Sequence, residues 1–427
     1  MRDKAAVASV GGAMLPSSFS RPMGDLRPER KPFNMLTSHI CGMIRLETAV
    51  RRRGMTLNRV LWATARASVA LIASVSMALA CTGIMLTGTD GSIVRARTAE
   101  WGPFDLETKI NIIPRGYTYS AGAMPDGQQG ASWTGRFGMV GISMLDHGAP
   151  ADGINEVGLT AGLFYLPGFT EYQEYLPELA DNTIPGDLLA SYVLSQYETV
   201  EEAQAGLEAV RVVGVVDETL GFPFPFHMLV ADRFGGRIVI EYIDGELTVF
   251  EAPLGVITNS PNYDWHMTNL NNYVNLSAIG LPSVEASGVT FAPLGAGSGM
   301  IGLPGDFTPP SRFVRAVAFS QTARTTDGGY DTVREAFRIL DNFNIPADAA
   351  EGAQDDVQSD DLLYSATQIT TASDSQNLTY FYHTMYDRTV HMVDMKQIDF
   401  GAMGDEMIVF ETSGDREPTI VNMTPSN

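Results

Sequence analysis

The sequence predicts an α+β protein built around antiparallel sheets. Short segments in which apolar and polar residues alternate come in runs, and segments with helical periodicity are grouped between those runs. Two turn signals, GTDG at 88–91 and DG at 244–245, each join two strand-like segments into a hairpin. No linker or repeat divides residues 81–427, so we expect a single domain there.

The individual elements follow from these periods in chain order. The expected strands are 81–86, 93–97, 138–144, 158–166, 227–231, 237–242, 247–251, 378–385, 389–395 and 406–410. The expected helices are 184–196, 200–210, 312–322 and 332–340. The first two begin near Pro185 and Thr199, residue types that favour a helix start.

Charge is spread unevenly along the chain. The 427 residues include 28 Lys and Arg and 50 Asp and Glu, but residues 1–80 hold 12 of the basic residues and only 4 of the acidic ones. Residues 81–427 are therefore strongly acidic, which argues against nucleic acid as a partner because phosphate contacts need clustered Lys and Arg. One of the two cysteines lies in each part, which excludes a disulfide scaffold.

Residues 55–80 have the pattern of a signal peptide. Arginines precede an uncharged stretch at 67–80, which ends in the small-x-small sequence ALA. That stretch is shorter than the ~20 apolar residues that cross a bilayer, so we expect no stable membrane span after cleavage. We therefore expect a periplasmic or secreted protein. Residues 1–54 show no clear pattern, and we interpret them as a mis-assigned start or a disordered extension.

Cleavage after residue 80 would make Cys81 the first residue of the mature chain. An N-terminal Cys carries a nucleophilic thiol and, in its free α-amine, a general base. Two alternatives stay open: a buried, inert Cys, or a Cys acylated as the anchor of a non-catalytic, lipid-anchored binding protein. The lipoprotein alternative is weakened by Ala78, because such signals usually have Leu at that position.

The first hairpin brings two charged residues close to Cys81. With a turn at 89–91, Cys81 faces Ala99 and Arg97 is a diagonal neighbour on the same face; with a turn at 90–91, Cys81 faces Glu100. Both registers place Arg97 and Glu100 near the cysteine. A neighbouring guanidinium favours the thiolate, which is the nucleophilic form. A surface ion pair is the alternative role for Arg97.

Four sequence blocks extend this hairpin over nearly all of residues 81–427. They are CTG at 81–83 with RTAEW at 97–101, DGINEVGL at 152–159, TNSPNYDWH at 258–266 and LPGDFTPPSRF at 303–313. Together they resemble the choloylglycine hydrolase and penicillin V acylase family. The resemblance implies an N-terminal-nucleophile hydrolase fold, an αββα sandwich with two stacked antiparallel sheets between helix layers. It also implies that a small N-acyl amide is cleaved at a linear, non-peptide C–N bond through a thioester acyl-enzyme, with no metal or organic cofactor.

The resemblance assigns roles to single residues. Cys81 matches the nucleophile, Arg97 the arginine beside it, and Arg312 a second active-site arginine. Asn259 matches the oxyanion-hole residue whose side-chain amide donates to the developing negative oxygen. Tyr165 matches the position that supplies the other donor through its backbone amide. From the residues alone, Asn259 could instead be a turn residue and Tyr165 ordinary core.

Two further positions and the substrate are less sharply defined. Glu100 stands where many members have an Asp that contacts the amine, so a catalytically inactive relative is one alternative. Trp101 either lines the acyl pocket or packs at the edge of the core. Family members cleave conjugated bile salts, penicillin V or acyl-homoserine lactones, and Tyr165 favours the penicillin V acylase side. The resemblance also suggests a homotetramer.

Overall fold

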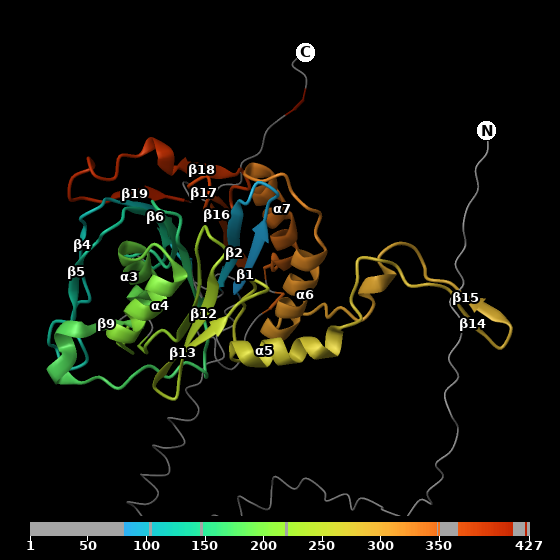
Figure 1. Ribbon diagram of the computed structural model, residues 1–427, viewed down its shortest axis with the longest axis horizontal. Helices are drawn as coiled ribbons and strands as arrows, with labels where there is room; N and C mark the ends of the chain where they lie inside the picture. Colours follow the sequence, from blue (N-terminus) through green and yellow to red (C-terminus); the bar gives the residue numbers. More distant parts are fainter. Residues whose placement is uncertain are drawn as a thin grey trace, which may run out of the picture. The chain divides into compact units, whose positions relative to one another are not determined.

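Two antiparallel sheets lie at the centre of the fold (Figure 1). The computed structural model describes residues 81–101, 105–145, 148–217, 221–347, 349–350, 366–412 and 423–424, all within the unit Ser74–Asn427. The expected extension 1–54 and signal peptide 55–80 lie outside the described residues.

The two sheets differ in size, and neighbouring strands in both are antiparallel. In order, the first sheet contains β1 (Cys81–Thr87), β2 (Ile93–Trp101), β16 (Ala366–Asp374), β17 (Thr379–Thr384) and β18 (His391–Asp394). The second contains β13 (Glu246–Glu251), β12 (Arg237–Ile243), β11 (Phe226–Ala231), β8 (Thr160–Tyr165), β7 (Asp152–Asn155), β6 (Met139–Ser143), β3 (Lys109–Ile113) and β19 (Ile408–Glu411).

Helices cover the outer faces of the sheets. Helices α6 (Pro309–Thr322) and α7 (Tyr330–Leu340) pack on the first sheet, as Figure 1 shows beside β1 and β2. On the second sheet, α3 (Leu189–Gln196) packs against β7 and β8, and α4 (Val200–Ala209) contacts β13. The layers therefore run helix, sheet, sheet, helix, which is the αββα sandwich that the sequence resemblance implies.

Shorter elements complete the described chain. They are the strand pairs β4 (Thr118–Ser120) with β5 (Ser132–Thr134), β9 (Thr183–Pro185) with β10 (Arg211–Val213) and β14 (Val284–Ala286) with β15 (Val289–Phe291), helix α5 (Tyr263–Asn269), and 3₁₀ turns at 177–182, 186–188, 270–273, 298–300, 341–343 and 395–397. The β14–β15 hairpin belongs to an arm, residues 278–292, in which every residue is exposed.

Local sequence explains where the main helices form. In α7, Val333, Ala336, Phe337 and Leu340 recur at helical spacing and are all buried, so one face of the helix meets the sheet. At the start of α4, the Thr199 side chain accepts a hydrogen bond from the Glu202 backbone N–H, and acidic residues occupy the first turn.

One predicted helix needs correction, and strand β7 was not predicted. The predicted helix 184–196 begins only at Leu189, because 183–185 pair with β10 as a strand; the Pro at 185 disfavours helical geometry for the residue before it. The segment 152–155 forms strand β7, although its Asp, Gly and Asn are residues that suit a turn. Its glycine, Gly153, lies opposite Gly141 at a point where a β-carbon would be 2.9 Å from the Gly141 Cα.

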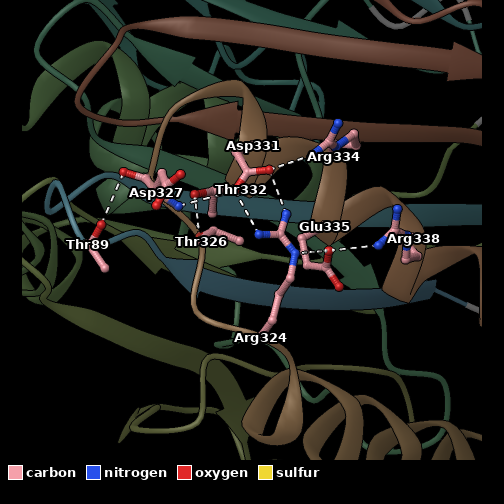
Figure 2. Close-up of polar contacts among 9 residues, drawn as sticks. All are labelled: Thr89, Arg324, Thr326, Asp327, Asp331, Thr332, Arg334, Glu335 and Arg338. Carbon is pink, nitrogen blue, oxygen red and sulfur yellow. Dashed lines mark hydrogen bonds and ion pairs between the residues drawn. The ribbon is translucent and has the colours of Figure 1, made fainter.

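The β1–β2 hairpin has the first of the two predicted registers, with Cys81 opposite Ala99. Contacts outside the hairpin hold its turn. The Thr89 backbone N–H donates to the Thr326 carbonyl at 3.0 Å, and the Thr89 hydroxyl donates to the Asp327 carbonyl at 3.3 Å (Figure 2). The segment before α7 therefore fixes the far end of the strand that begins with Cys81.

That segment is itself held by an exposed network of charges. Arg324 donates to both carboxylate oxygens of Asp331, at 3.0 and 2.6 Å, and to Glu335 at 3.1 Å, while Arg334 and Arg338 contact the same two carboxylates (Figure 2). Such exposed pairs contribute little individually.

The two sheets are joined by a buried ion pair. Arg95 on β2 donates from Nη1 to Asp152 Oδ2 on β7 at 2.6 Å, and both side chains are almost completely buried. Thr371 and Tyr380 donate to the other carboxylate oxygen at 3.2 and 3.0 Å. At Gly162 a β-carbon would lie 2.5 Å from Asp152 Oδ2, so only glycine leaves room for the pair. Because the charge of Asp152 is fully paired, its burial is compatible with a stable fold.

We predict that Asp152→Asn destabilises the protein by about 3–5 kcal/mol, because the substitution leaves the Arg95 guanidinium buried without a counter-ion. Urea denaturation followed by circular dichroism measures the change in the free energy of unfolding.

Arg324→Ala is the control for this prediction. It removes an arginine that also bridges carboxylates but is exposed, and it should cost about 1 kcal/mol or less. Equal losses for the two variants would contradict the idea that the buried pair joins the sheets.

Candidate active site

Cys81 is the first residue of β1, the edge strand of the first sheet, and its side chain is buried. Arg97 Nη2 lies 3.0 Å from the thiol sulfur. The arginine is held in place by the Leu163 carbonyl, which accepts from Nη1 at 2.5 Å, and by the ring of Phe164, whose centroid lies 4.3 Å from the guanidinium. The predicted hairpin geometry is confirmed: Cys81 lies opposite Ala99, and a fixed cation contacts the cysteine sulfur.

The Asn259 side chain extends from the loop after β13 to the Cys81 backbone. Its Oδ1 accepts from the Cys81 backbone N–H at 2.8 Å and from Arg312 Nη2 at 2.6 Å. Its Nδ2 donates to the Tyr165 carbonyl at 2.7 Å. The amide nitrogen carries two hydrogens. The second has no hydrogen-bond partner among the described residues, so it can meet an oxygen that develops negative charge.

Arg312 enters from α6 and is fully buried. Besides Asn259 it contacts the Cys81 carbonyl at 2.5 Å and the Thr82 hydroxyl at 3.0 Å, both through Nη1. Burial lowers the pKa of Arg312 to about 10, which still leaves a cation at neutral pH. Arg312, in the first turn of α6, therefore ties β1 to the Asn259 loop.

Glu100 lies three residues after Arg97 on β2, so its side chain leaves the opposite face of the strand, although both residues line the cavity described below. One carboxylate oxygen accepts from the Thr367 hydroxyl at 3.0 Å, and the other is buried with no partner among the described residues. Burial raises the pKa of Glu100 to about 7, although Arg312 opposes the shift. The chain here still continues before Cys81, and the Cys81 N–H donates to Asn259; contact between Glu100 and a free amine stays a prediction.

A cavity opens beside the cysteine, and its empty volume, which includes part of the solvent at its mouth, is about 670 Å³. Its walls are mostly apolar, and an aromatic series forms part of them. Trp101 meets Tyr165 edge to face at 6.3 Å, Tyr165 meets Phe226 at 6.5 Å, and Phe226 stacks on Phe224 at 5.1 Å. Trp101 thus both lines the pocket and packs in the core, so the two predicted roles coincide.

The structure adds residues that sequence patterns missed. Leu163, Phe226 and Asp187 line the cavity, and the Leu163 carbonyl also orients Arg97. None of them carries a motif, because each becomes part of the site only through the packing of the two sheets. Among the described residues, no group of His, Cys, Asp and Glu is placed to hold a metal ion, and no helix is long and apolar enough to cross a membrane.

Sequence comparison identifies known proteins that are similar to this chain. Residues 81–410 match the family described as linear amide C–N hydrolases, choloylglycine hydrolase family. A bile salt hydrolase/transferase from Clostridium perfringens is 29% identical over 322 residues, covering 74% of this chain and 93% of the relative. A penicillin V acylase from Pectobacterium atrosepticum is 27% identical over 357 residues, covering 79% and 86%.

Solved structures agree with the fold. A crystal structure of a mutant conjugated bile acid hydrolase from Clostridium perfringens superposes with a TM-score of 0.68 at 25% identity, covering 81% of this chain and all of the other. A penicillin V acylase from Agrobacterium tumefaciens has a TM-score of 0.63 at 24% identity, covering 80% and 94%. The chain belongs to the choloylglycine hydrolase family of linear amide C–N hydrolases.

Proposed function

We propose that this hydrolase cleaves N-acyl amides with Cys81 as an N-terminal nucleophile. The observation that carries the proposal is the 3.0 Å contact between Arg97 Nη2 and the Cys81 sulfur at the wall of an apolar cavity. The family membership supplies the reaction type, hydrolysis of a linear C–N amide bond.

The steps balance without any cofactor. The α-amine of Cys81 takes the thiol proton, and the sulfur attacks the amide carbon while the carbonyl oxygen gains negative charge. The C–N bond then breaks, the leaving amine takes the proton from the α-ammonium, and a thioester remains. Water attacks the thioester and releases the acid. Asn259 Nδ2 is our proposed donor to the oxygen, with the Tyr165 backbone amide as the second donor and Arg312 holding the loop.

We further propose that the mature chain begins at Cys81 after export to the periplasm or medium. The signal-peptide pattern at 55–80 supports this assignment. Burial of the thiol against Arg97 argues against the lipid-anchored alternative, because a lipid on the sulfur would need to displace that contact.

The apolar cavity favours an uncharged acyl group. The aromatic wall formed by Trp101, Tyr165 and Phe226 suits a phenoxyacetyl group or an acyl chain. The relatives named above include both a bile salt hydrolase and a penicillin V acylase, so family membership does not choose between them.

The homotetramer suggested by sequence resemblance stays a prediction. The exposed arm 278–292 is the surface that we expect to contact another copy. Its apolar side chains include Ile279, Val284, Val289 and Phe291, which are 79%, 59%, 53% and 60% exposed. Exposed apolar groups gathered in this way are typical of association surfaces.

We predict that Cys81→Ser lowers kcat at least ~100-fold, because a hydroxyl is a far weaker nucleophile than a thiol at neutral pH. The assay uses secreted protein whose first residues are read by Edman degradation as Cys-Thr-Gly-Ile. Active protein that starts upstream, or near-normal turnover by the Ser variant, would remove Cys81 from its role.

We predict that Asn259→Ala lowers kcat roughly 10²–10³-fold with little change in KM, because an oxyanion donor acts mainly in the transition state. The matched control is Ser260→Ala in the same loop; among the described residues, the Ser260 hydroxyl forms one hydrogen bond, to the Pro167 carbonyl at 2.7 Å. If Asn259 were only a turn residue, its variant would lose melting temperature and keep kcat, like the control.

We predict that penicillin V or an acyl-homoserine lactone is cleaved at least as well as glycocholate. The aromatic wall around Tyr165 accommodates a flat ring or a chain, and no described cavity residue beyond Arg97 offers a positive charge to a conjugated bile salt. Values of kcat/KM for the three substrates on one preparation decide the matter, and a clear preference for glycocholate would contradict the assignment.

A further inference from the structure

The backbone on both sides of the Asn259 Cα is held by two buried histidines. His227 on β11 lies with Nε2 3.1 Å from the Thr258 carbonyl oxygen, and His266 on α5 lies with Nε2 2.8 Å from the Asn259 carbonyl oxygen. Both imidazoles are about 1% exposed. A carbonyl can only accept, so Nε2 carries the hydrogen in each ring.

Glu241 on β12 connects His227 to the far end of the same loop, at Asn262 and Tyr263. Its Oε1 faces His227 Nδ1 at 3.0 Å and accepts the Tyr263 backbone N–H at 3.0 Å. Its Oε2 accepts from the Asn262 side chain at 3.0 Å. The carboxylate is fully buried, and its three partners lie on two separate parts of the fold. Glu241 therefore closes loop 258–263 at both ends.

The hydrogen-bond geometry shows why a carboxylate stands at this position. Both nitrogens of His227 face oxygen atoms, and the Tyr263 N–H and Asn262 amide are further donors to Glu241. A carboxylate accepts from the Tyr263 N–H and the Asn262 amide at the same time, whereas a neutral amide would present hydrogens at one of its two ends. His227 then links the carboxylate to the Thr258 carbonyl, with Nδ1 against Glu241 and Nε2 against the carbonyl oxygen.

His266, the second histidine that holds the loop, is neutral. Burial lowers the pKa of His266 to about 4, so the ring carries no charge at neutral pH. It stacks on Phe313 of α6 at 4.7 Å between ring centroids, with 13° between the planes. The helix that delivers Arg312 to Asn259 Oδ1 thus also supports the ring that holds the Asn259 carbonyl.

We propose that Glu241, acting through His227, is a positioning residue for amide hydrolysis. It fixes loop 258–263 so that the Asn259 amide is already aimed at the oxygen of the tetrahedral intermediate. This inference rests on the proposed function, in which Asn259 is the oxyanion donor. Donors of this kind act only when held within a few tenths of an ångström, and a displacement of about 1 Å costs on the order of 100-fold in rate.

A double-mutant cycle tests the proposal. Glu241→Gln keeps the size of the side chain but turns one acceptor into a donor. The loop therefore loses one of the hydrogen bonds that hold it to β12. In the parent enzyme we expect kcat to fall about 10-fold or more, with KM changed less than about twofold. In the Asn259→Ala background the same substitution should change kcat by less than about twofold, because the donor that Glu241 positions has been removed.

A merely structural role gives a different pattern. If Glu241→Gln lowers kcat by the same factor in both backgrounds, or leaves kcat of the parent intact, the proposal is overturned. Asn262→Ala is the milder second variant, should Glu241→Gln fold poorly: it removes one contact of Glu241, and its smaller loss of kcat should also vanish in the Asn259→Ala background.

Glu335→Gln is the matched control for the cycle. Glu335 is also a poorly exposed carboxylate that accepts from two side chains, Arg324 and Arg338, but it lies on α7 in the network of Figure 2. We expect it to lower the melting temperature and leave kcat unchanged in both backgrounds. A parent enzyme that hydrolyses no N-acyl amide would refute the proposed function itself, whereas an active parent with an additive cycle would refute only the positioning role.

Discussion

Burial of the guanidinium groups of Arg95, Arg97 and Arg312 is the constraint around which the structure is arranged. A guanidinium has five N–H donors and cannot give up its charge inside a protein, so each must find acceptors with fixed geometry. Arg95 contacts Asp152 and Arg97 contacts the Leu163 carbonyl, in each case across the gap between the sheets. Arg97 also contacts the Cys81 thiol within its own sheet. Arg312 finds the Cys81 carbonyl and Asn259. Sheet packing and site geometry are therefore satisfied by the same contacts.

Local sequence was enough to predict the contact between Cys81 and Arg97. The turn at 89–91 fixes the hairpin register, and the register alone brings Arg97 to the Cys81 sulfur, because strand neighbours are set by counting residues from the turn. Helices α4, α6 and α7 were also predicted within a few residues, since each has an apolar face of helical period.

The remaining site residues could not be placed from local pattern. Asn259 and Arg312 are separated from Cys81 by 178 and 231 positions, and nothing in their immediate neighbours tells where they meet. They were identified through resemblance between whole sequence blocks. Strand β7 was not predicted because Asp152 and Gly153 are turn formers; burial opposite Arg95 and close backbone packing override that preference. Glu241 and His227 carry no motif, so only the folded structure reveals them.

Strand β1 lies at the edge of its sheet, a position that exposes proteins to aggregation. An edge strand exposes unpaired backbone groups that can template another chain into an intermolecular sheet. Here Gly83 exchanges hydrogen bonds with Ile257 in both directions, at 2.8 and 3.1 Å, so part of that edge is already paired. A β-carbon at position 83 would lie 2.6 Å from the Phe164 ring and 2.7 Å from the Ile257 side chain. The absence of a side chain at this glycine thus protects the strand that carries the cysteine against aggregation.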